Sequence, residues 1–86
     1  VVTAFYMRMA VSDKPGVLAQ ITQILGNAGI SIEAIRQQTH VSSQVPVIIL
    51  TRPVVEGHMN DAIKAIEALA DVNGAVTRIR VENLDG

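Results

Sequence analysis

The sequence Asp-Lys-Pro-Gly-Val-Leu at residues 13–18 decides how this chain folds, because it marks a corner between a strand and a helix. Before it, residues 5–11 alternate in polarity with the period of a half-buried strand, and after it apolar residues recur at helical spacing. Asp13 can accept a backbone N–H from the first helical turn, and Pro15 suits that turn because its missing donor is not needed there. Gly16 has no side chain, so another molecule can approach the backbone. The corner is therefore predicted either as a capped helix start or as a pocket for a small zwitterion, whose carboxylate suits the positive end of the helix.

The rest of the chain continues the pattern with two helices and three more strands. Gly29 stands where a left-handed cap would end the first helix, and a change of alternation near Glu33 predicts a bulge in the next strand. Residues 39–44 are predicted as a polar hairpin connection, and Pro53 is predicted to end the strand that follows. The predicted elements are a helix over 17–28, a strand over 30–36, a central strand over 45–50, a helix from about 56 to 70 and a strand over 75–81.

This order, βαββαβ, predicts an α+β fold of the ferredoxin-like type. Because each crossover between parallel strands is right-handed, both helices should stack on one face of a four-stranded antiparallel sheet. No third helix remains to cover the second face. The alternation predicts a mixed apolar and basic lining for that face, made of Tyr6, Arg8, Ala10, Ile48, Arg78 and Arg80.

Composition limits the partners that the chain can have. Its 86 residues make one small domain, and 49% of them are hydrophobic, with a mean hydropathy of +0.34. Such a surplus predicts an apolar surface that a partner chain covers. A net charge of −1 argues against nucleic acid, and no apolar run is long enough for a membrane span. The lack of cysteine excludes disulfides and thiolate sites and fits a cytoplasmic location.

The sequence contains no constellation of residues suited to catalysis. His40 and His58, its two histidines, lie in a predicted loop and near a helix start, without the spacing of metal ligands. No histidine is placed to activate a serine. RNA-binding modules share the βαββαβ order but stack bases on aromatic residues of the central strands, and residues 45–50 contain none. We therefore expect no catalytic residue, no metal and no cofactor within this chain.

The corner and the opening of the second strand together resemble the ACT domain family. The residues that carry the resemblance are the D-x-P-G-x-L motif at 13–18 and Gly-Ile-Ser-Ile at 29–32, and the likeness extends from about Ala4 to Glu82. ACT domains are regulatory modules that bind amino acids and commonly pair side by side. The resemblance implies a single ordered domain over about 4–82, a homodimer, and an effector site at the seam that includes Asp13, Gly16 and Ser31. Val11 stands where some amino-acid-binding members have a histidine.

Within that family, residues 29–38 and 45–51 look most like the C-terminal domain of homoserine dehydrogenase, an NAD(P)-dependent enzyme that threonine often inhibits. The resemblance implies that nucleotide-binding and catalytic domains lie upstream, outside this chain, and that the chain, which begins at Val1, is a piece of a longer enzyme. It also implies that threonine or a similar small amino acid is sensed at a dimer interface. Two alternatives stay open, namely an ACT domain that only dimerises and the ACT domain of another biosynthetic enzyme such as phosphoglycerate dehydrogenase.

Overall fold

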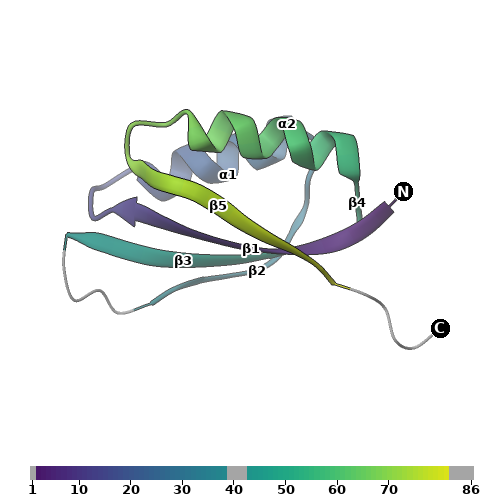
Figure 1. The fold of residues 1–86 in the computed structure, drawn as a ribbon, viewed down its shortest axis with the longest axis horizontal. Coiled ribbons are helices and arrows are strands. Elements are labelled where there is room, and N and C mark those ends of the chain that lie inside the picture. The colour runs from purple at the N-terminus through teal and green to yellow at the C-terminus, as the bar shows by residue number, and fades with distance from the viewer. Residues whose placement is uncertain (1, 39–42, 82–86) are drawn as a thin grey trace.

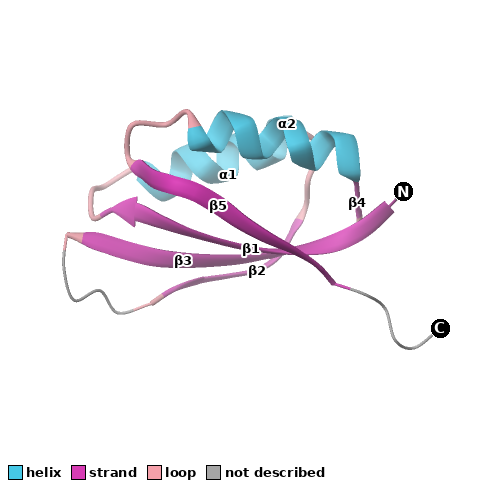
Figure 2. Ribbon diagram, viewed as in Figure 1, coloured by secondary structure: helices cyan, strands magenta, loops and turns pink. Residues whose placement is uncertain are grey.

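A computed structural model describes residues 2–38 and 43–81 and shows two layers, a sheet with two helices packed on one of its faces (Figure 1). The predicted hairpin connection over 39–44 and the end of the chain therefore fall largely outside the described residues. Figure 2 shows that both helices lie on the same side of the sheet. The elements are β1 (Val2–Ser12), α1 (Val17–Asn27), β2 (Ile32–Gln37), β3 (Gln44–Thr51), β4 (Val54–Val55), α2 (Glu56–Glu67) and β5 (Val72–Val81).

The sheet is antiparallel, with β1 and β3 at its centre. β3 pairs with β2 on one side and with β1 on the other, and β1 also pairs with β5. The predicted α+β architecture and its βαββαβ order are confirmed. One strand was not predicted: after Pro53, the two residues of β4 pair with Val2 and Thr3 at the start of β1. Proline lacks the N–H needed to continue the β3 ladder, and the chain resumes pairing with β1 as soon as Pro53 is passed.

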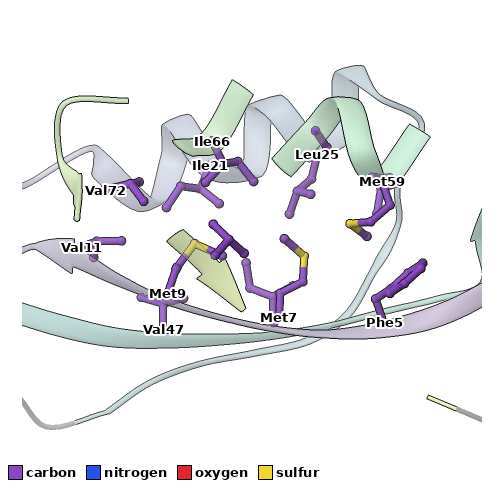
Figure 3. Close-up of a cluster of buried hydrophobic side chains, with 14 of the residues drawn as sticks. Phe5, Met7, Met9, Val11, Ile21, Leu25, Val47, Met59, Ile66 and Val72 are labelled. Carbon is purple, nitrogen blue, oxygen red and sulfur yellow. The ribbon is translucent and has the colours of Figure 1, made fainter. Parts of the chain in front are cut away.

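The core lies between the sheet and the two helices. Figure 3 shows Met7 and Met9 of β1 pointing toward Ile21 and Leu25 of α1, as the alternation of β1 and the helical spacing after Val17 predict. Thirteen of the buried core residues come from four elements, β1, α1, β3 and α2. They are Phe5, Met7, Met9, Val11, Val17, Ile21, Leu25, Val45, Val47, Ile49, Met59, Ala62 and Ile66. Burial on this face is therefore the main source of stability.

A single polar side chain is buried among the residues that the structure describes. Thr51, at the end of β3, is only 1% exposed, and its hydroxyl oxygen accepts the backbone N–H of Phe5 at 3.0 Å. A buried N–H without an acceptor would lower the stability of the fold. The hydroxyl of Thr51 supplies the acceptor for the N–H of Phe5, which the β1–β3 ladder leaves unpaired.

The left-handed cap of α1 and the bulge in β2 are both confirmed. Gly29 has φ 77°, and the N–H groups of Gly29 and Ile30 donate to the carbonyls of Gly26 and Leu25 at 3.0 and 2.9 Å. These two bonds form a Schellman motif, in which only glycine adopts the positive φ at little cost. In β2 the register with β3 shifts between Ile32 and Ala34, which places the extra residue at position 33.

The predicted lining of the second sheet face is wrong for β5. Arg78 and Arg80 pair with Met7 and Phe5 of β1, so they share the helix face with these core residues. The residues of β5 that face away from the helices include Thr77, Ile79 and Val81, and Ile79 is 56% exposed. We call this second face the open face. Strand pairing aligns its central residues in two neighbouring rows that run across the sheet. One row is Ile79, Tyr6, Leu50 and Ala34, and the next is Thr77, Arg8, Ile48 and Arg36.

The two arginines of β5 lie at the margin of the core and bind α2. Arg80 Nη2 is 2.7 Å from Glu56 Oε1, and Arg78 contacts the Asn60 side chain while its guanidinium lies 5.8 Å from the centre of the Phe5 ring. The hydrogen bond and the positive charge of Arg80 lower the pKa of Glu56. An arginine can thus occupy an inward position at an edge strand, because its stem covers apolar surface while its charged end reaches a partner at the rim.

Candidate functional site

The corner before α1 is a tight turn that glycine closes. Gly16 has φ 86° and ψ −12°, the conformation of the second central residue of a type II turn, in which proline is common at the position before it. The N-cap of α1 is Gly16 and the helix begins at Val17, so the predicted place of Pro15 in the first helical turn is wrong, while the cap by Asp13 stays a prediction. The first bond within the helix runs from the N–H of Gln20 to the carbonyl of Gly16 at 3.1 Å. The N–H groups of residues 17–19 therefore point out of the helix start.

Three loops meet at this end of the sheet (Figure 1). The N–H of Ser12 donates to the carbonyl of Asp71, just before β5, at 2.8 Å, and the N–H of Asp13 donates to the carbonyl of Ser43, just before β3, at 2.9 Å. Lys14 Nζ also lies 3.3 Å from Asp71 Oδ1. We call this meeting of residues 12–16, 43–44 and 71–73 the junction. Its backbone bonds hold the corner against the starts of two strands.

The junction contains a polar hollow of about 380 Å³. It is large enough for a small metabolite and contains both a carboxylate and an ammonium group, so it presents complementary charges to a zwitterion. None of its lining side chains is aliphatic or aromatic. We call it the junction hollow; its lining residues are Ser12, Asp13, Lys14, Ser43, Gln44 and Asn73.

The three residues predicted to bind an effector do not meet within one chain. Asp13 lines the junction hollow, whereas Gly16 lies at the neighbouring turn, is exposed, and does not line it. Ser31 lies at the opposite end of the sheet, where its carbonyl accepts the N–H of Arg52 at 2.9 Å. Since a strand rises about 3.3 Å per residue, the two ends of β3 that anchor Asp13 and Ser31 are roughly 25–30 Å apart.

The sequence analysis missed most of the residues that form the hollow. Lys14 is a variable position of the D-x-P-G-x-L motif, and Asn73 lies between the predicted second helix and the last strand and belongs to no motif. A topological signal could have found them: in an antiparallel sheet, the end of β1 lies beside the starts of β3 and β5, so polar residues at these three points must converge.

A second hollow, of about 390 Å³, lies between the two helices on their outer side. Its floor is formed mainly by alanines and Ile24, with polar groups of Asn27, His58 and Asp61 at its rim. Within residues 2–38 and 43–81, no three side chains of the metal-binding types come together, and His40 lies outside these residues. In the same part of the chain, neither helix has the length and apolar character that crossing a bilayer requires.

Comparison with known proteins places the chain among regulatory domains. The family model described as "ACT domain" matches residues 6–71. The chain is 50% identical over 84 residues to a homoserine dehydrogenase of Methylobacillus glycogenes, and 48% identical over 85 residues to that of Pseudomonas aeruginosa. These matches cover 95% and 96% of this chain but 20% of each relative, so the chain spans about a fifth of the length of either enzyme.

Solved structures agree with this result. A homoserine dehydrogenase from Thiobacillus denitrificans superposes with a TM-score of 0.90 at 48% identity, over 98% of this chain and 18% of that one. The ACT domain of a GTP pyrophosphokinase from Chlorobium tepidum superposes with a TM-score of 0.73 at 15% identity, over 92% of this chain and all of that one, which shows the shared fold alone.

Proposed function

The chain belongs to the ACT domain family, and on that premise we propose that it is the amino-acid-sensing regulatory domain of a homoserine dehydrogenase. The observation that carries this proposal is the junction hollow, where a carboxylate and an ammonium lie beside each other at the ACT corner. The parent would be a cytoplasmic NAD(P)-dependent oxidoreductase whose catalytic domains lie outside this chain. The chain itself would bind no nicotinamide cofactor.

The proposed effector is a small amino acid, with threonine first and serine or isoleucine behind it. Its ammonium group would bind the carboxylate of Asp13, and its carboxylate would lie near the N–H groups that surround Gly16. Ser31 of a second copy would bind the side-chain hydroxyl. The hollow is of the right size and charge for such a ligand, which supports the assignment.

The free edge of β2 supports the proposed homodimer. Among the described strands β2 pairs only with β3, and Ile35 on this edge strand is 41% exposed. If two copies paired antiparallel through β2, the start of one β2 would lie beside the end of the other. Ser31 of the second copy would then come to the end of the sheet that holds the junction. A two-fold dimer would in this way unite residues that one chain keeps apart.

Binding at such a seam would favour one arrangement of the two copies. The attached enzyme would respond to this arrangement as a population shift, with a coupling free energy of about 1–3 kcal/mol, as is typical of allosteric proteins.

Calorimetric melting of the 86-residue chain with a panel of amino acids tests the proposal. A ligand at a hundred times its dissociation constant should raise the free energy of unfolding by about 2.7 kcal/mol. Asp13→Asn should abolish this rise, whereas the matched variant Asp61→Asn, on the exposed side of α2, should keep it. A melting midpoint that no amino acid moves would reject sensing and leave an ACT domain that serves only in dimerisation.

A further inference from the structure

The junction hollow opens on the side of the sheet away from the helices. Ser12 pairs with Gln44, and Asn73 pairs with Ala10, so all three share the open face with Tyr6. The N–H groups at the start of α1 belong to the helix layer, and Gly16 does not line the hollow. A ligand seated in the hollow therefore meets side chains of the open face more readily than it meets the helix start.

We propose that an effector in the junction hollow binds its carboxylate to Lys14, in place of the N–H groups near Gly16, and its side chain to Asn73 of the same chain, in place of Ser31 of a second copy. Lys14 gives up Asp71 to do so. This inference rests on the proposed function and names contacts that the family resemblance does not supply. Lys14 is the one cationic side chain among the lining residues, and Asn73 offers both a donor and an acceptor. Asp13 remains the partner of the ligand ammonium.

The Lys14–Asp71 ion pair is suited to such an exchange. The Lys14 side chain is 65% exposed, and the nitrogen–oxygen distance is 3.3 Å. Ion pairs in this setting contribute little to stability because water screens them, so a ligand carboxylate can replace Asp71 at small cost. Since Asp71 immediately precedes β5, the exchange would alter how the loop between α2 and β5 is held to the corner.

The lining also defines the class of ligand. Its side chains end in two hydroxyls, two amides, a carboxylate and an ammonium, which offer hydrogen bonds, and no aliphatic side chain is present to pack against a branched aliphatic group. A polar group left without a partner in such a site weakens binding. The preferred effector is therefore an amino acid with a short hydroxyl or amide side chain, which narrows the candidates of the proposed function to threonine and serine and sets isoleucine aside.

Isothermal titration calorimetry with threonine and valine, which have nearly the same shape, tests these contacts on the 86-residue chain. Lys14→Met should weaken threonine binding about tenfold, as expected for the loss of a charge-assisted bond. Asn73→Ala should reduce the preference for threonine over valine. Asp71→Asn should strengthen threonine binding several-fold, because Lys14 then has no competing carboxylate. If the Lys14–Asp71 ion pair had only a structural role, removing it would not increase the affinity for threonine.

The control is Lys64→Met, which removes an exposed ammonium on α2 and should leave the affinity unchanged. Circular dichroism should show that all four variants keep the native fold. If threonine binds the unaltered chain but Lys14→Met and Asp71→Asn leave its dissociation constant within about twofold, the inference is wrong while amino-acid sensing stands. If valine binds as well as threonine, the assigned ligand class is wrong. If no amino acid binds at all, sensing and the inference fail together.

Discussion

The two faces of the sheet are formed by the same strands, yet one is closed and the other is open. On β1, Phe5, Met7, Met9 and Val11 are at most 3% exposed beneath the helices, whereas their neighbours in sequence face away from them. The helix face supplies the buried apolar area, and the open face carries Tyr6, two arginines and, at its junction end, the polar hollow. Alternate residues of one strand are therefore divided between the apolar core, which stabilises the fold, and a face that the helices leave open.

A pair of identical substitutions on opposite faces should show this division most strongly. Ile21→Ala, at a position with no exposed surface in α1, should lower the free energy of unfolding by about 2–5 kcal/mol, because it leaves a cavity. Ile79→Ala, on the open face, should cost less than about 1 kcal/mol, mostly through β-propensity. Urea titrations of both variants measure the difference, and equal losses would show that the open face is covered in solution.

A second pair of substitutions tests the one buried hydroxyl. Thr51→Val keeps the shape of the side chain but removes the acceptor of the Phe5 N–H, and should cost about 1–3 kcal/mol. Thr77→Val, at an exposed open-face position, should change the free energy of unfolding by less than about 0.5 kcal/mol. The same urea titrations apply; a neutral Thr51→Val would mean that the N–H of Phe5 has another partner.

The smallest expected effect concerns the edge where the helix face meets solvent. Because Arg80 lowers the pKa of Glu56, the folded chain releases this proton more readily than the unfolded chain, whose carboxyl titrates near 4.5. The resulting stability is present above pH 4.5 and is lost as the pH falls through the lowered pKa of the folded state. Arg80→Met should therefore flatten the dependence of the melting midpoint on pH in the acid range. Arg36→Met, on the open face, should leave that dependence unchanged.

Local signals in the sequence were sufficient for most of the fold. The alternation of residues 5–11, the glycine cap at Gly29 and the bulge near Glu33 all depend on neighbouring residues, and each was predicted correctly. The orientation of β5 was not, since hydrophobicity favoured Ile79 as an inward residue over Arg78. Register with β1 decides the face of each residue, and bonds from the arginines to α2 compensate their inward position. Such bonds join residues far apart in the sequence, so the pattern of neighbouring residues does not predict them.

The candidate site was predicted only in part for the same reason. Asp13 was found because it belongs to a contiguous motif, and it does line a hollow. Lys14, Ser43 and Asn73 come from three separate segments of the chain, and only the topology of the sheet brings them together. Ser31 remains a prediction that depends on how two copies pair.

Nuclear magnetic resonance titration of the ¹⁵N-labelled chain with threonine tests the central claim, that the open junction of the sheet is the binding surface. The largest amide shift changes should fall on residues 12–14, 43–44 and 71–73, with smaller changes at the start of α1. Changes centred instead on the groove between the helices, at residues 24–28 and 58–65, would contradict it, as would a spectrum that threonine leaves unaltered.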